Sequence, residues 1–139
     1  MRKIVPKALV GAGGWGYFSG GLGAYARAFS FVEVNATFYR RISETTTRRW
    51  RASVPEGFTF SVKVHRDVTH RAGLRPTPAA RAAFAQCSRV ARLLRAPYLI
   101  LETPSSLPIG AEQVDGLREF ASMAPKGVRV GLEARAHAG

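Results

Sequence analysis

Charged side chains recur near the ends of four apolar runs, and their types are those that transfer protons or hold anions. Three carboxylates and one ammonium are the candidate catalytic groups: Glu33, Lys63, Glu102 and Glu133. A carboxylate beside an ammonium suits general acid–base catalysis, in which one group gives a proton and the other takes it. This chemistry fits hydrolysis of a phosphate-bearing substrate, with a glutamate as base or metal ligand and Lys63 or His65 as its positioned partner.

A second polar side chain follows two residues after three of these groups. In an extended strand, the side chains of residues i and i+2 share one face. The pairs are Glu33 with Asn35, Lys63 with His65, and Glu133 with Arg135. Both faces of a parallel sheet are normally covered, so a charged stripe there indicates a site at the carboxyl ends of the strands. The alternative is a set of ion pairs that serve structure alone, such as Lys63 with Glu33 or Glu102.

Aromatic and guanidinium groups alternate between residues 35 and 51. Rings stack on bases and guanidinium groups contact phosphates, so this composition suits a nucleic acid or another phosphate-bearing ligand. We predict substrate contacts from the side chains of Trp15, Asn35, Tyr39, His65, His70 and Arg135. Trp50 has the alternative role of a core residue.

The segment from Gly11 to Gly16 has the glycine spacing of a dinucleotide-binding loop. That mechanism requires a helix to open at the last glycine, and three further glycines between residues 20 and 23 argue against one. We expect instead a tight loop that packs Trp15 and Tyr17 near the site.

The three histidines, His65, His70 and His137, match no compact metal motif. A divalent metal held by histidine together with Glu33, Glu102 or Glu133 remains an alternative, so the cofactor stays open.

The overall charge favours an anionic partner. The chain has 139 residues, 21 of them Lys or Arg against 9 Asp or Glu, for a formal net charge of +12. Such a domain attracts polyanions by counterion release, although a solvated basic surface is the alternative. No apolar run is long enough to span a membrane, and the single Cys87 fits a buried thiol in a reducing, cytoplasmic compartment.

Strands and helices alternate along the whole chain. Expected strands cover residues 8–11, 31–35, 58–65, 97–102 and 128–133, and expected helices cover residues 22–29, 43–54, 78–95 and 111–123. Regular alternation predicts parallel strands with right-handed crossovers, either in an open doubly wound sheet or in a (β/α) barrel. A complete eight-unit barrel needs about 200 residues or more, so a single domain over residues 1–139 supplies about half of one.

Several segments together resemble the DUF72 (YecE-like) family. They are Gly11 to Trp15, Tyr25 to Phe29, Val32 to Tyr39, Trp50, Pro55 to Lys63, Thr69–His70 and Glu133 to Arg135. The resemblance implies an α/β fold of the TIM type, here incomplete with about five strands and four helices, and a pocket at the carboxyl ends of the strands. It implies no settled activity, because the family is named for its unknown function.

The chain departs from the family pattern at three places. Glu102 stands where the family has a neutral amide, which adds a charge to the expected pocket. The loop after Trp15 is short, and the sequence stops after residue 139 where the family continues with further β/α units. We therefore expect the N-terminal half of a barrel that associates with a second copy or with a separate C-terminal half. The alternatives are a fragment of a longer protein and a rearrangement as an open sheet.

Three functions stay open at this stage. The first is a barrel that binds or hydrolyses a phosphate-bearing substrate, acting as a hydrolase of the phosphodiesterase or nuclease kind. The second is a non-catalytic basic module that binds nucleic acid or protein. The third is an inactive half-barrel.

Overall fold

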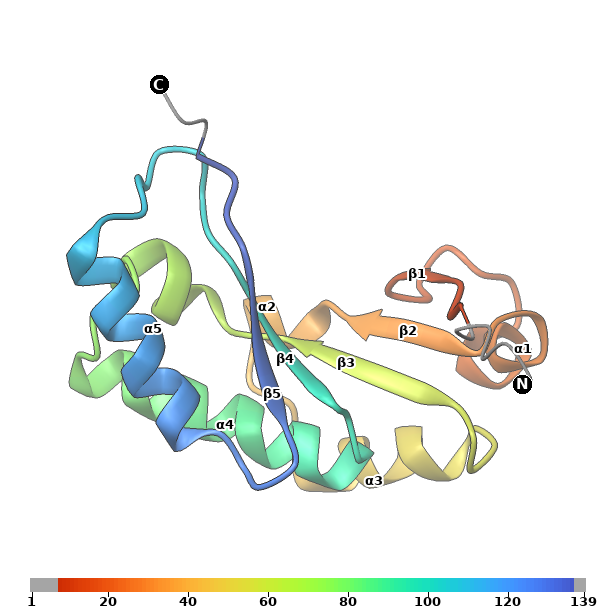
Figure 1. The fold of residues 1–139 in the computed structure, drawn as a ribbon. Helices are drawn as coiled ribbons and strands as arrows, with labels where there is room; N and C mark the ends of the chain where they lie inside the picture. Colours follow the sequence, from red (N-terminus) through yellow and green to blue (C-terminus); the bar gives the residue numbers. More distant parts are fainter. Residues whose placement is uncertain (1–7, 137–139) are drawn as a thin grey trace, which may run out of the picture.

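The computed structural model describes residues 8–136 as one five-stranded parallel sheet with helices (Figure 1). The strands are β1 (Gly11–Gly13), β2 (Phe31–Val34), β3 (Thr59–Lys63), β4 (Tyr98–Glu102) and β5 (Arg129–Glu133). Their order in the sheet is β1-β2-β3-β4-β5, so each new strand joins the same advancing edge. A doubly wound sheet would reverse its strand order at a switch point. The winding is therefore that of an incomplete TIM-type barrel.

Six helices connect or flank the strands, two more than the sequence predicted. They are α1 (Gly21–Ala28), α2 (Ala36–Tyr39), α3 (Glu44–Ala52), the π-helix η1 (Asp67–Arg71), α4 (Pro78–Leu94) and α5 (Ala111–Met123). The two unpredicted helices, α2 and η1, lie directly beyond the carboxyl ends of β2 and β3. Among residues 8–136, no helix is long and apolar enough to cross a membrane.

Side-chain caps fix where the two best-predicted helices begin. The Ser43 hydroxyl accepts a hydrogen bond from the Thr46 amide at 3.1 Å, and the Thr77 hydroxyl accepts one from the Ala80 amide at 3.1 Å. Each cap satisfies an amide that the first helical turn leaves free. Pro78 follows at the first helical position, where its missing amide hydrogen costs nothing.

One face of the sheet, which we call the covered face, carries the core. Helices α3, α4 and α5 lie on this side (Figure 1). Its strand residues are fully buried: Val32, Val34, Phe60, Val62, Leu99 and Leu101. Phe84 of α4 and Phe120 of α5 pack against each other above the sheet, with ring centroids 5.1 Å apart. The apolar positions of the predicted amphipathic helix over residues 78–95 supply much of this packing, including Cys87.

The opposite face, which we call the inner face, is polar and open. In register across the sheet, Glu33 pairs with Ser61, Lys63 with Ile100, and Glu102 with Glu133. No helix in the described part of the chain covers this face (Figure 1). In a closed barrel these side chains would point to the interior.

The first strand lies three residues later than predicted, over Gly11–Gly13 instead of residues 8–11. At Gly11 the strand lies very close to β2. A Cβ atom on Gly11 would lie 1.9 Å from the carbonyl oxygen of Phe31, which no side chain tolerates. Glycine is therefore required in a strand whose composition resembles a loop.

Candidate functional site

An ion-pair cluster lies at the carboxyl ends of β3 and β4, where the sequence predicted chemistry. Lys63 Nζ lies 2.6 Å from Oε2 of Glu102, and Nη1 of Arg135 donates to the other carboxylate oxygen at 3.1 Å. The Lys63 and Glu102 side chains are only 14% and 15% exposed. The hydrogen bond from Lys63 lowers the pKa of Glu102 most, and the charges of Lys63 and Arg135 add to it. Glu102 is therefore held as a carboxylate.

The short helix α2 positions the lysine of this cluster. The Thr37 hydroxyl lies 3.1 Å from the carbonyl oxygen of Val34 and 2.6 Å from that of Lys63, and it joins the ends of β2 and β3. Phe38, one residue on, places its ring under the lysine, with Nζ 4.7 Å from the ring centroid. A cation over a ring face is stabilised by the ring quadrupole. The ammonium group is thus held between a carboxylate and an aromatic face.

Glu33 and Glu133 face the same side of the sheet but form no ion pair within residues 8–136. Both line a hollow of about 450 Å³ in the inner face, together with Tyr98 and Ile100. Burial raises the pKa of Glu33. The Lys63 charge opposes this, while the charges of Glu133 and Glu102 raise the pKa further. The two neighbouring carboxylates Glu33 and Glu102 therefore have pKa values shifted in opposite directions, which is a pattern seen in acid–base sites.

His70 and Tyr39 join this cluster through Phe38. The His70 and Tyr39 rings both meet Phe38 edge to face, with centroids 5.0 and 4.9 Å away. Burial lowers the pKa of His70, opposed by the charge of Glu102, and its Nδ1 lies 2.9 Å from the Thr69 hydroxyl. The predicted contact residue His70 thus lies beside the predicted catalytic lysine.

His65 does not join Lys63, contrary to the expectation that the two share a strand face. The strand ends at Lys63, so the alternation of side chains stops there. His65 lines a separate cavity of about 70 Å³ against α4 with Cys87, and its Nδ1 accepts a hydrogen bond from the Asp67 amide at 3.1 Å. Burial raises the pKa of Cys87 to about 11, which confirms a buried, unreactive thiol.

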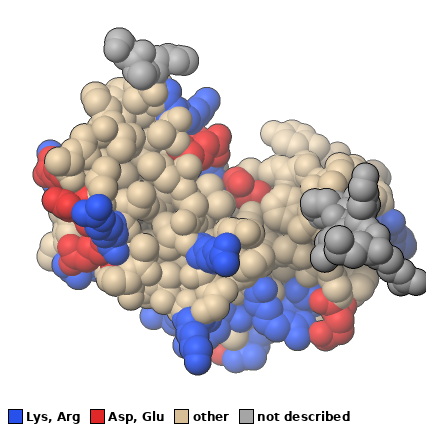
Figure 2. All heavy atoms as spheres, viewed as in Figure 1, with Lys and Arg blue, Asp and Glu red and all other residues tan. Residues whose placement is uncertain are grey.

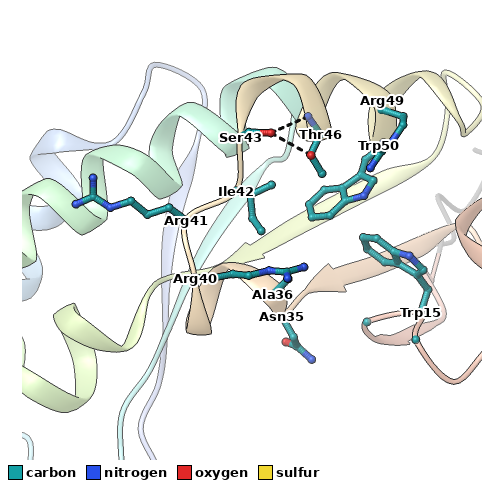
Figure 3. A pocket seen from close by; sticks show the side chains of 12 residues that line it. Trp15, Asn35, Ala36, Arg40, Arg41, Ile42, Ser43, Thr46, Arg49 and Trp50 are labelled. Carbon is teal, nitrogen blue, oxygen red and sulfur yellow. Dashed lines mark hydrogen bonds between the residues drawn. The ribbon is translucent and has the colours of Figure 1, made fainter.

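A second candidate site lies at the ends of β1 and β2. Trp15, from the loop after β1, and Trp50 of α3 pack against each other and line one wall of an open cavity of about 690 Å³ (Figure 3). Their ring planes are nearly perpendicular, at 86°, with centroids 5.0 Å apart. Arg40 extends toward the two indole rings from below, and Arg49 lies beside Trp50 (Figure 3). Trp50 also packs against the core, so it combines both predicted roles.

This cavity is basic and contains no acidic side chain. Of the acidic residues in the described part of the chain, none forms an ion pair with Arg40, Arg41 or Arg49. The Oδ1 atom of Asn35, at the cavity edge, is buried without a hydrogen-bond partner among residues 8–136. Arg51 differs, because it donates to the carbonyl oxygens of Phe58 and Pro55 and serves the fold. The cavity therefore combines aromatic faces with free guanidinium groups.

The glycine loop holds Trp15 in this cavity but does not hold Tyr17. Tyr17 is fully exposed, so the expectation that it packs near the site is wrong. The first helix after the loop begins at Gly21, five residues past Gly16. The dinucleotide mechanism lacks its helix N-terminus, as the additional glycines predicted.

Metal ligation finds no support in residues 8–136, where no three His, Cys, Asp or Glu side chains are close enough to hold an ion. His137 lies outside the described residues.

The predicted residues thus divide between two candidate sites, except His65, which lies apart in the small cavity against α4. The inner face gathers Glu33, Lys63, Tyr39, His70, Glu102, Glu133 and Arg135, and the indole cavity holds Trp15 and Asn35. Four residues at these sites were not among the predicted site residues: Phe38, Arg40, Arg41 and Arg49. The alternation of aromatic and arginine residues after residue 35 indicated a binding segment. It did not show which of these side chains lie close together in the folded protein.

The fold and these sites define a parallel α/β protein wound in barrel order, with polar groups at the carboxyl ends of its strands. One family model, described as protein of unknown function DUF72, matches residues 18–138. The chain belongs to the DUF72 family.

Two solved structures of DUF72 family proteins share this fold. The protein from Enterococcus faecalis is 18% identical, with a TM-score of 0.70, over 91% of this chain and 51% of that one. The protein from Thermotoga maritima is 23% identical, with a TM-score of 0.61, over 81% of this chain and 45% of that one. The chain thus spans about half the length of these solved relatives. A comparison with curated proteins gave no match.

Proposed function

We propose that this protein binds a phosphate-bearing ligand with a flat ring, and that the cavity lined by Trp15 and Trp50 is its binding site. The observation that supports this most is the composition of the cavity. Two indole rings and three arginines without acidic partners line about 690 Å³ of open space. Ring stacking contributes about 1–3 kcal/mol per base in proteins that bind single strands.

The arginines supply the groups that would bind the phosphate of such a ligand. A guanidinium group presents a planar fork of donors that matches the oxygens of a phosphate group. Arg40 and Arg49 lie on either side of the Trp50 ring (Figure 3). A ligand ring in the cavity would therefore have its phosphate within reach of a free cation.

Tryptophan fluorescence tests this proposal directly, because the chain has only two tryptophans and both line the cavity. Titration with a thymidine trinucleotide should quench the emission in a saturable manner. Arg49→Gln should weaken binding by about tenfold, the expected cost of one charge-assisted contact. Arg27→Gln removes an equal charge from the end of α1, away from the cavity, and should leave the affinity unchanged. Equal behaviour of the two variants would contradict the proposal.

Hydrolysis of a phosphodiester is a second candidate, favoured by the opposite pKa shifts of Glu33 and Glu102. In this reaction a water molecule loses a proton to a carboxylate and attacks phosphorus. The P–O bond to the leaving alcohol breaks, and the alcohol takes up a proton. Lys63 and Arg135 would stabilise the charge on the phosphoryl oxygens. A non-catalytic binding module remains the alternative.

Turnover of bis(4-nitrophenyl) phosphate, with and without added Mg²⁺, separates these two functions. Glu33→Gln should abolish release of nitrophenol while trinucleotide binding persists. Glu56→Gln, an exposed residue paired with Arg95, is the matched control and should retain activity. Absence of turnover in the unmodified protein under both conditions would leave the binding function alone.

We also propose a partner for the inner face, either a second copy or a separate C-terminal half that completes the barrel. The open sheet face, the unpaired outer edges of β1 and β5, and the exposed ring of Tyr98 support this. Sedimentation should show concentration-dependent association of the 139-residue chain. A monodisperse monomer that binds no hydrophobic dye would contradict this.

A further inference from the structure

A second basic cavity adjoins the indole cavity. It has a volume of about 340 Å³ and lies between α3 and α4, with Arg89 and Arg92 of α4 in its wall. The wall also holds Glu44 and Arg48, which neutralise each other as an ion pair. Ile42 and Ser43 line both cavities, so the two share a common boundary at the start of α3. The basic lining of the indole cavity therefore continues along the molecule.

Hydrogen bonds hold one of these arginines at the boundary. Gln86 of α4 donates to the carbonyl oxygen of Ile42 at 2.8 Å, and its own side-chain oxygen accepts from Nη2 of Arg89 at 2.7 Å. Arg89 is thereby tied to the wall that both cavities share. Holding an exposed arginine side chain in one conformation costs conformational entropy, so most such side chains remain mobile. The hydrogen bond to Gln86 opposes this mobility at Arg89.

Arg41 connects the indole cavity to Gln86, which also lines the second cavity. It lines the indole cavity and also a small cavity with Gln86. Its side chain points away from the two tryptophans (Figure 3). Arg40, Arg41, Arg89 and Arg92 thus line adjoining cavities between the indole rings and α4, and we call this set the arginine track.

Cations without acidic partners are concentrated along this track. Seven of the nine acidic residues of the chain form ion pairs with other residues: Glu44, Glu56, Asp67, Glu102, Glu112, Asp115 and Glu119. Glu44 lines the second cavity, but its carboxylate is paired with Arg48. Figure 2 shows the contrast, with red and blue groups intermixed beside α5 and blue groups gathered where α3 and α4 lie. Within residues 8–136, no acidic side chain pairs with the four track arginines. Close like charges repel, and a bound polyanion would relieve that repulsion.

We propose that the ligand is a single-stranded nucleic acid of several nucleotides, with one base stacked on the cavity side of the Trp15–Trp50 pair and its following phosphates along the arginine track. This inference rests on the proposed function, because it extends the same site. A mononucleotide would leave Arg89 and Arg92 unused. A duplex keeps its bases stacked inside and cannot offer a ring to the indole cavity, so the single strand fits both features.

The experiment compares two fluorescein-labelled oligothymidylates, one of three and one of twelve residues, by fluorescence anisotropy across a salt series. The double variant Arg89→Gln/Arg92→Gln should weaken the longer strand by about tenfold and leave the shorter one unchanged. The slope of log affinity against log salt for the longer strand should fall in magnitude by about 1.4, since each lost phosphate contact removes about 0.7. The matched control, Arg27→Gln/Lys126→Gln, removes the same charge from exposed residues outside both cavities.

Each outcome decides between the two proposals. Loss of the longer strand alone supports the arginine track. Equal loss with both double variants overturns the track, because only net charge would matter. Equal affinity of both strands for the unmodified protein also overturns the arginine track but leaves the proposed indole site in place. Failure of both strands to quench tryptophan fluorescence overturns the proposed function itself.

Tighter binding of a twelve-base-pair duplex, or of an acidic polypeptide such as poly-glutamate, overturns the choice of a single strand. Unchanged melting temperatures show that the variants remain folded.

Discussion

The two faces of the sheet share one backbone but differ in burial and in side-chain chemistry. The covered face consists of fully buried valine, leucine and phenylalanine side chains under α3, α4 and α5. The inner face carries Glu33, Lys63, Glu102 and Glu133 and remains open in the described part of the chain. The alternation of strand side chains produces both from one sequence. Stability therefore comes mainly from one face, and chemistry is available on the other.

Truncation of an aromatic side chain should give the largest difference in stability between the two faces. Phe84→Ala on the covered side removes a fully buried ring that packs on Phe120, and should cost about 3–5 kcal/mol in the free energy of unfolding. Tyr98→Ala on the inner face removes a ring that is 43% exposed, and should cost less than about 1 kcal/mol. Urea denaturation followed by circular dichroism measures both. Equal losses would indicate that the inner face is covered in solution.

Removal of the Glu102 charge should have the next largest effect. Glu102→Gln keeps the side-chain shape but leaves the mostly buried Lys63 ammonium group without its counter-charge, and should cost about 2 kcal/mol at pH 7. The pKa of Glu102 is lowered in the folded state, so its stabilising contribution exists above the unfolded pKa and disappears as pH falls through the folded value. The difference between the proteins should therefore shrink in acid. A loss that does not change with pH would contradict the ion-pair explanation.

Glu33 should show the smallest effect and the opposite sign. Burial raises its pKa, so the folded state favours the protonated form. The stability from this proton is present below the unfolded pKa and is lost as pH rises through the folded value. At pH 7, Glu33→Gln should stabilise the protein slightly, by about 0.5 kcal/mol, and the gain should vanish in acid. Glu56→Gln is the exposed control, and a loss of stability at pH 7 would show that Lys63 compensates the Glu33 charge.

Local sequence signals predicted the covered side of the molecule well. The expected helices over residues 43–54 and 78–95 are confirmed by α3 and α4, which begin after Ser43 and Thr77. The ion pair of Lys63 with Glu102 was an explicit alternative, and it is present. These features depend on spacing within one element or on neighbouring strand ends, which a sequence displays directly.

The parts that were not predicted depend on contacts between distant segments. Helix α2 begins directly after β2 because Thr37 binds the Lys63 carbonyl oxygen, 26 residues away. The π-helix η1 occupies what reads as a basic loop, with Val68 and Thr69 buried. The indole cavity forms only because the loop after β1 contacts the helix α3, which follows β2. No sequence pattern within either segment predicts that contact.

Thr37 has a consequence for how this protein can change over time. Its single hydroxyl group fastens a helix of four residues that has Asn35 at its N-terminus, at the edge of the indole cavity, and carries Phe38 under the ammonium group of Lys63. A substitution that tilts this helical turn would displace Asn35 and Phe38 together. Mutations in α2 therefore cannot adjust the ring-binding cavity and the charged inner face independently, and divergence of either one must come through the loop after β1, α3 or the later strands.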